Sequence, residues 1–222
     1  MISNRRVGAV LAVVLLISTS GCVGVLTGTE PLTFAAEPAA VADAAAEQAG
    51  YELNGTRAVE INRTFEVAGQ ERRVVVTNQV TTYTKSVDLG PLGEQRLGLF
   101  TVVSTPAVEI AGRTLNPIGS YSNRRLVELV QQRYSGLRDV RAVSAQNITV
   151  QGTETEVTKF AATATIAGRE IDVYVHVTKY RDGEDFVLAI GVYPQKLPGE
   201  GENVLAMMRA IEHPTSVPTA TA

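Results

Sequence analysis

The sequence predicts an α+β fold in which antiparallel β-sheet meanders pack with about three helices. Several segments alternate apolar and polar side chains, which is the period of a half-buried strand. Short glycine-containing turns separate these segments, and other segments carry helical spacing with end signals. The order helix, strand, Ala-Gly turn and strand occurs around Ala68-Gly69 and again around Ala167-Gly168. We therefore consider two pseudo-repeated helix–βββ units sharing one sheet or packing face to face.

Three segments have both helical spacing and end signals, namely residues 38–49, 123–134 and 203–212. Gly50 suits the position after the first helix, because glycine adopts the left-handed conformation without strain. Ser122 is a natural N-cap for the second helix. Pro214 follows the third helix, whose Val204 and Met207 are expected to point inward with Met208 and Ile211.

Strands are expected where apolar side chains alternate, at residues 57–67, 72–84, 96–104, 147–151, 160–166, 171–180 and 186–193, with a small hairpin over 108–115. Two-residue turns at Ala167-Gly168 and Asp182-Gly183 would place Phe160 opposite Val175 and Val175 opposite Ile190. These pairs fall on one apolar face. A slip of one residue would invert a strand, so this agreement supports the pairing.

The first 22 residues have the order of a secretory signal peptide. Arg5 and Arg6 are followed by the apolar stretch 7–17, which is too short to span a bilayer, and then by small residues. The only cysteine, Cys22, comes next, so no disulfide is expected. We expect Cys22 to be lipidated as the first residue of the mature chain. A plain signal peptide with a free or buried Cys22 stays open, as does the choice between the Sec and twin-arginine export routes.

This interpretation fixes a domain plan and a location. The plan is a signal peptide at 1–21, a lipidated tether at 22–36, a single α+β domain at 37–213 with candidate halves 37–118 and 119–213, and a disordered tail at 214–222. The protein is expected to be exported and lipid-anchored at the outer face of the cell membrane. Removing the signal peptide takes away two arginines and no acidic residue, so the net charge of −3 becomes −5. Such a balance argues against nucleic acid as a partner.

The sequence contains no nucleophile elbow, zinc-protease, phosphate-loop or dinucleotide motif, so no catalytic residue, metal ligand or cofactor is predicted. One polar face stands out on the strand 171–180. It carries Asp172, Tyr174, His176 and Thr178, and small neighbours such as Ala161 leave room beside them. This face is the candidate binding face. The same room would also suit a packed helix or water.

The second histidine, His213, follows Glu212 at the predicted end of the last helix, where a cation is favourable. The run Asp182–Asp185 is interpreted as a tight hairpin turn, because it lacks the alternating oxygen ligands of a calcium loop. Export would make three sequons candidate glycosylation sites, at Asn54, Asn62 and Asn147.

Several stretches carry a family resemblance. Ser20-Gly21-Cys22 resembles the lipobox of prokaryotic lipoproteins. Together with Ala49-Gly50-Tyr51 and Asn116-Pro117-Ile118, it makes the mature chain resemble a family of haloarchaeal lipoproteins of unknown function. That resemblance implies no activity. From Ser122 onward, the order of elements is similar to the PsbP/Mog1 type of α+β sandwich, a likeness of topology that implies no function.

The sequence thus favours a non-enzymatic binding module at the cell envelope. Its expected partners are the membrane, through the lipid on Cys22, and an unknown envelope protein or small ligand. Two alternatives remain open. One is a lipid or solute carrier, and the other is an enzyme that uses the Tyr174 and His176 face.

Overall fold

The segments in which apolar and polar side chains alternate form the strands of a large, mainly antiparallel sheet. The structure is a computed structural model that describes residues 31–67, 70–88, 93–110, 113–133, 136–166, 168–216 and 219–220. The long strands are β3 (Glu52–Val67), β4 (Gln70–Asp88), β5 (Glu94–Pro106), β8 (Leu137–Val150), β9 (Thr153–Ile166), β10 (Arg169–Asp182) and β11 (Asp185–Pro194). The short strands are β1 (Leu32–Ala35), β2 (Ala40–Val41), β6 (Glu109–Ile110), β7 (Arg113–Thr114), β12 (Ile211–Glu212) and β13 (Thr219–Ala220).

The sheet has nine strands in the order β13-β3-β4-β5-β11-β10-β9-β8, with β1 paired to β4 off this path. Two small ladders accompany it, β12 with β2 and β6 with β7. The first-half strands β3–β5 and the second-half strands β8–β11 therefore share one sheet. The pairing of β5 with β11 joins the two halves.

The chain forms two compact units, which are described separately. Among the described residues, the smaller unit comprises 31–34, 61–67 and 70–76, and so contains the end of β3 and the start of β4. The larger unit comprises the described residues within 35–60 and 77–220. All the residues of the site described below belong to the larger unit.

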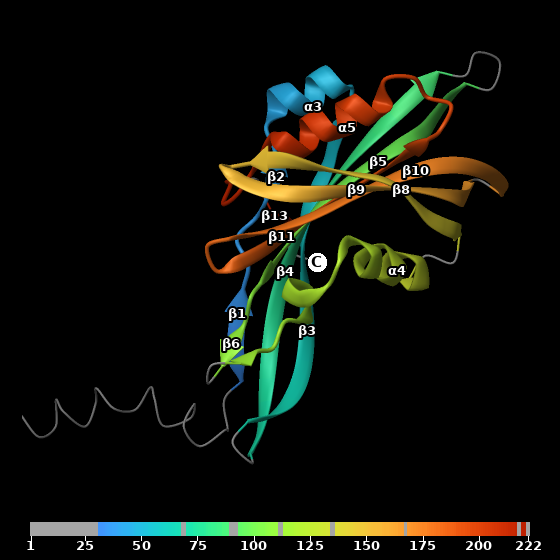
Figure 1. Cartoon of the computed structure of the whole chain (residues 1–222). Helices are drawn as coiled ribbons and strands as arrows, with labels where there is room; N and C mark the ends of the chain where they lie inside the picture. The colour runs from blue at the N-terminus through green and yellow to red at the C-terminus, as the bar shows by residue number, and fades with distance from the viewer. Residues whose placement is uncertain are drawn as a thin grey trace, which may run out of the picture. The chain divides into compact units, whose positions relative to one another are not determined.

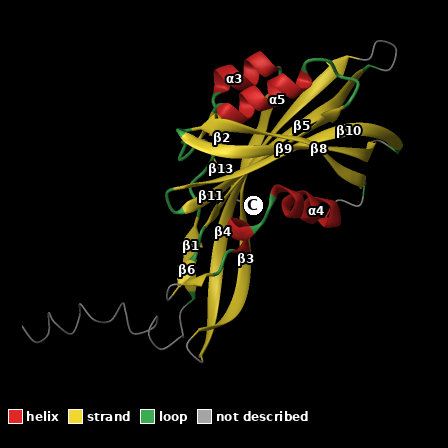
Figure 2. Cartoon of the chain, in the orientation of Figure 1, coloured by secondary structure: helices red, strands yellow, loops and turns green. Residues whose placement is uncertain are grey.

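Helices cover both faces of the sheet in the larger unit (Figure 1 and Figure 2). α3 (Asp43–Ala49) and α5 (Glu200–Arg209) lie side by side on one face, where Phe100, Ile148 and Tyr193 join Met207 and Met208 in one core. α4 (Asn123–Arg133) lies on the other face, preceded by the short 3₁₀ helix η2 (Pro117–Ser120). The hydrophobic core between α4 and the sheet contains Leu126, Val127, Phe160, Val173, Val175 and Val177.

The observed register confirms one predicted strand pair and corrects the other. Phe160 lies opposite Val175, as the turn at residues 167–168 predicts. Val175, however, lies opposite Val192 and not Ile190, because the second turn uses Gly183-Glu184 instead of Asp182-Gly183. Gly183 has a φ of 56° at the first turn position, as a type II′ turn requires. The two-residue shift keeps every side chain on its predicted face.

The helices largely follow their end signals. The N-cap prediction is confirmed, since the backbone N–H of Arg125 donates to Ser122 Oγ at 3.2 Å. Gly50 ends α3 with a φ of 73°, also as predicted. The first helix begins at Asp43 and not at residue 38, because Ala40–Val41 pairs with β12 as a strand. The last helix spans Glu200–Arg209 and so begins and ends three residues before the predicted range 203–212.

The predicted signal peptide, Cys22 and the first part of the predicted tether lie outside the described residues, as do parts of the predicted tail. Within the described part of the chain, no helix combines the length and the apolar character that crossing a membrane requires.

Candidate functional site

Tyr174 forms the accessible part of the predicted binding face. Its ring is half-buried, and the Lys159 ammonium lies 3.7 Å from the ring centroid, a cation–π contact. The ring of Tyr193 supports it from the neighbouring strand, with centroids 5.9 Å apart. Asp172 is exposed beside it and accepts a hydrogen bond of 3.4 Å from Thr163 Oγ1. The surface therefore combines an aromatic ring with charges of both signs.

His176 lies on the same face but is buried, with 2% of its surface exposed. Its Nε2 is 3.0 Å from the Tyr193 hydroxyl, and its Nδ1 makes no hydrogen bond within the described residues. Burial, assisted by the positive charge of Lys159, lowers the pKa of His176 to about 4. His176 is therefore neutral at pH 7.

Thr178 is also fully buried, and its hydroxyl donates to the Glu156 carbonyl at 2.9 Å. The four predicted residues thus share one face of β10 as expected, but only Asp172 and Tyr174 reach the surface. Gly191, which lies opposite His176, shows why. A Cβ on Gly191 would lie 2.5 Å from Val204 Cγ1, so α5 packs directly on β11 there.

A buried ion pair fixes the start of α5 near this face. Glu200 has 1% of its surface exposed, and its Oε2 accepts from Lys85 Nζ at 2.6 Å. The same ammonium donates to the Ala49 carbonyl at the end of α3, at 2.9 Å. Burial and the Glu200 charge raise the pKa of both Tyr51 and Tyr193. Lys85 therefore joins β4, α3 and α5, and no local signal in the sequence points to this contact.

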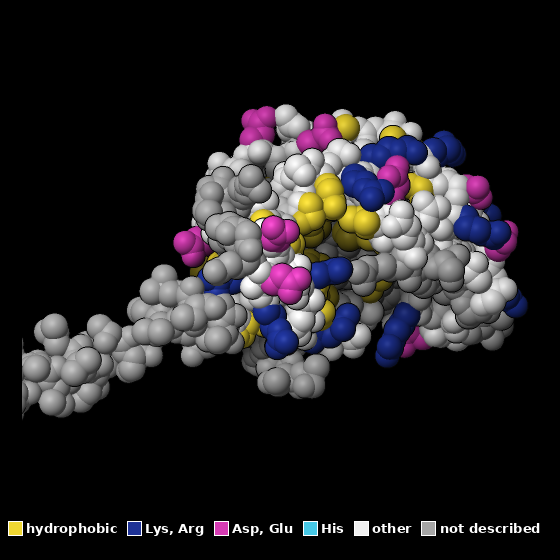
Figure 3. Space-filling model, turned by 90° about the horizontal axis from the view of Figure 1, so that it is seen from below, with side chains coloured by type: hydrophobic (Ala, Val, Ile, Leu, Met, Phe, Trp, Pro, Cys, Tyr) yellow, Lys and Arg dark blue, Asp and Glu magenta, His cyan; other side chains and the backbone are white. Residues whose placement is uncertain are grey.

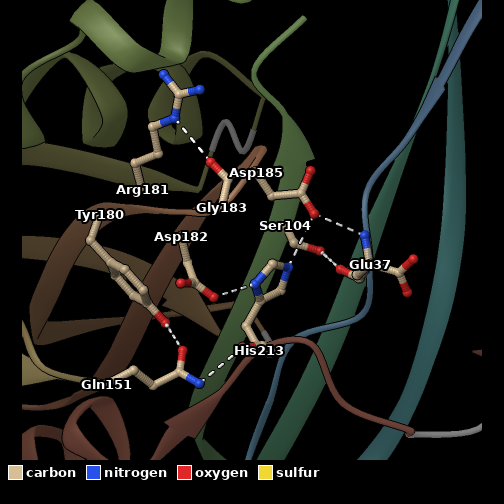
Figure 4. Close-up of polar contacts among 9 residues, drawn as sticks. All are labelled: Glu37, Ser104, Gln151, Tyr180, Arg181, Asp182, Gly183, Asp185 and His213. Atoms are coloured by element: carbon tan, nitrogen blue, oxygen red, sulfur yellow. Dashed lines mark hydrogen bonds and ion pairs between the residues drawn. The ribbon is translucent and has the colours of Figure 1, made fainter.

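A second polar cluster surrounds His213 (Figure 4). His213 Nδ1 lies 2.9 Å from Asp182 Oδ2, and Nε2 lies 3.1 Å from Asp185 Oδ2. The same Asp185 oxygen accepts from the Glu37 backbone N–H at 2.9 Å. Gln151 Nε2 donates to the His213 carbonyl at 2.9 Å. The cluster thus ties the segment after α5 to the β10–β11 turn and to the start of the domain.

The environment of His213 corrects its predicted role as a helix C-terminal cation. α5 ends at Arg209, and His213 follows β12. Burial by itself would lower its pKa, but the hydrogen bonds and charges of Asp185 and Asp182 outweigh burial and raise the pKa. The carboxylates come from the predicted tight turn, 28 and 31 residues earlier in the chain. No local sequence signal links positions so far apart.

An apolar strip lies on the side of the sheet that carries α4, the side seen in Figure 3. We define it as Leu99 and Val103 of β5 with Ile190 and Val192 of β11. Leu99 lies opposite Val192 and is 42% exposed, and the other three side chains are partly buried. α4 packs against β8, β9 and β10, next along the sheet.

The described residues contain no cluster of three or more His, Cys, Asp or Glu placed to hold a metal ion. The sequons lie on strands. Asn54, Asn62 and Asn147 are all exposed, Asn54 and Asn62 on β3 and Asn147 on β8.

Comparison with known proteins shows the family. Residues 38–212 match the model described as Domain of unknown function (DUF6517), and the chain belongs to this family. No curated protein matches the chain.

Two solved structures are similar to it in part. PsbP from the cyanobacterium Synechocystis sp. PCC 6803 has 12% identity and a TM-score of 0.41, over 81% of this chain and 93% of that one. A protein of unknown function from Pseudomonas aeruginosa has 14% identity and a TM-score of 0.37, over 71% of this chain and 96% of that one.

Proposed function

We propose that this protein is an exported lipoprotein that binds a partner protein or a small ligand at the outer face of the cell membrane, without catalysis. The observation that carries the binding role is the Tyr174 surface. There, an aromatic ring is held by Lys159 and Tyr193 beside the exposed Asp172. Tyrosine is enriched among the residues that dominate binding energies, and a ring already fixed by its neighbours loses little entropy on binding.

The anchor is supported by the segment before Cys22 and by the resemblance to haloarchaeal lipoproteins. A lipid on Cys22 would confine the domain near the membrane and so raise its effective concentration there. If the attached lipid has two chains, it would hold the protein stably.

The burial of His176 favours binding over catalysis on this face. A general base must come within hydrogen-bonding reach of its substrate. His176 is covered, neutral at pH 7 and in contact with Tyr193. An enzyme built on this face would have to work from Tyr174 and Asp172.

The anchor is tested by membrane fractionation and intact mass of the wild type and Cys22→Ser. We expect a membrane-bound wild type with a modified N-terminal Cys22, and a released or unprocessed variant. Identical behaviour of the two proteins, with an unmodified Cys22, would rule the anchor out.

The binding surface is tested by placing a photoreactive phenylalanine analogue at position 174 in living cells. We expect a discrete crosslinked species that weakens when Lys159→Ala or Asp172→Asn is added. The same analogue at the exposed Glu52 is the matched control. Equal crosslinking from both positions would contradict a specific surface at Tyr174.

A further inference from the structure

One edge of the sheet ends at β8. This strand is last in the strand order, and among the described residues no strand pairs with its outer side. An open edge presents unpaired backbone N–H and C=O groups to other chains, so folded proteins protect such edges. The two halves of β8 differ in how they are protected against pairing with another strand.

The first half of β8 is protected in the usual ways. Its register against β9 shifts between Arg138 and Arg141 and again between Ala142 and Ser144. Asp139 has a φ of 56°, and this half carries the charges of Arg138, Asp139 and Arg141. Bulges and charges both hinder edge-to-edge pairing.

The second half of β8 lacks these devices. From Ser144 to Val150 it pairs regularly with β9. The chain from Ala142 to Thr153 contains no charged residue and no proline. A regular, uncharged edge that ends in the β-branched residues Ile148, Thr149 and Val150 is the kind that associates with other strands. Some other feature must therefore cover this half.

The sequon Asn147-Ile148-Thr149 lies in the middle of this uncharged half, and Asn147 and Thr149 are both exposed. Asn147 Nδ2 donates to the exposed carboxylate of Glu154 at 2.6 Å, a contact that water can replace. The Asn54 sequon differs, because its Thr56 hydroxyl is buried against Thr81 Oγ1 at 3.0 Å.

The Asn62 sequon lies on a strand that already has charges. Around Asn62, β3 carries Glu60, Arg63 and Glu66. An added group is therefore not needed to keep that stretch from pairing with other strands.

We propose that Asn147 carries an N-linked glycan, which covers the uncharged half of the β8 edge. This inference rests on the proposed export of the protein. The donor would be an oligosaccharide linked to a lipid phosphate. Asn147 Nδ2 bonds to the anomeric carbon of the sugar and loses a proton, while the bond from that carbon to the phosphate oxygen breaks and the lipid phosphate leaves. A bulky hydrated glycan on an edge strand hinders the approach of a second strand.

Trypsin gives a direct test on protein purified from the cells that export it, because cleavage after Arg141 and Lys159 isolates the Asn147 sequon alone. We expect the 142–159 peptide to carry added sugar mass in the wild type and in Thr149→Ser. The mass should be lost completely in Asn147→Gln and Thr149→Ala, and retained in Asn54→Gln. On size exclusion, Asn147→Gln should associate at concentrations where the wild type is monomeric.

An unmodified 142–159 peptide in the wild type overturns the glycan. If β8 then exchanges its amide protons slowly in a dimer, a second copy of this chain covers the edge. The mass of the Cys22 peptide from the same sample separates the two proposals. If the Cys22 peptide carries a lipid and the 142–159 peptide carries no sugar, only the glycan proposal is wrong. If the sugar is present and the lipid is absent, only the anchor proposal is wrong. The absence of both modifications contradicts both proposals.

Discussion

His213 lies between two carboxylates, and this position gives it a defined effect of pH on stability. Its native pKa is raised above the unfolded value of about 6.5. The charged histidine therefore stabilises the fold fully below about pH 6.5, and this contribution is lost as the pH rises through the native pKa. We predict that His213→Asn lowers the free energy of unfolding more at pH 6 than at pH 9. Urea titrations at both pH values check this.

The neighbouring Glu212→Gln is the matched control, because Glu212 is exposed and no ion pair with His213 is observed for it. It should leave the pH dependence of the wild type unchanged. An equal loss for His213→Asn at the two pH values would show that the contacts of His213 do not depend on its charge.

His176 has the opposite effect. Its native pKa of about 4 lies below the unfolded value, so the native state resists protonation. Its contribution to stability is present above about pH 6.5 and falls as the pH drops toward 4, by on the order of 2 kcal/mol. We predict that His176→Gln removes this loss, measured as the change in unfolding free energy between pH 6.5 and pH 4.5. His213→Asn should retain it, and an unchanged slope in His176→Gln would contradict the buried neutral state.

At the level of elements, the close approach of α5 to β11 depends on Gly191. A side chain at this position would collide with Val204, as the 2.5 Å separation shows. We predict that Gly191→Ala lowers the free energy of unfolding by about 1–3 kcal/mol, the usual cost of overpacking. Adding Val204→Ala should recover part of this loss. Thermal unfolding of both variants and of Val204→Ala alone measures the coupling. Strictly additive losses would mean that the two residues do not collide.

Much of the element plan follows from the sequence, because strand alternation and turn residues are local signals. The β9–β10 register follows from the Ala167-Gly168 turn, whereas the β10–β11 register is shifted because the second turn starts one residue later, at Gly183. β8 is far longer than the predicted 147–151, since its first half is exposed and bulged and so lacks apolar alternation. Ala40–Val41 lies within the predicted helix 38–49 but forms a strand, because it pairs with β12.

The sequence predicts less of the candidate site than of the helices and strands. The polar face of β10 was identified because Tyr174, His176 and Thr178 alternate with valines. Whether this face is open depends on α5, which is placed by residues distant in sequence, such as Lys85 and Glu200. A polar side chain in a strand shows which face of the sheet it lies on, but not whether that face is exposed to solvent. The sequence alone therefore does not show that Tyr174 is accessible and His176 is buried.

At the scale of the whole molecule, the two faces of the sheet in the larger unit differ in how completely they are covered. On the α4 side, Leu99 of the apolar strip remains 42% exposed. We predict that Leu99→Thr reduces the fluorescence of a dye that binds apolar surfaces, with little change in melting temperature. Leu53→Thr, at a similarly exposed leucine that is not part of this strip, is the control. Equal effects of the two changes would show that the strip is no more adhesive than an isolated surface leucine.

The pairing of β2 with β12 has a further consequence. The Thr215 N–H donates to the Pro38 carbonyl at 3.0 Å, and Ile211 lies opposite Val41. Residues 38 and 215 therefore lie side by side in the larger unit, although they are far apart in the sequence. A circular permutant that links residue 216 to residue 36 and opens at the exposed Gln151-Gly152 turn should fold.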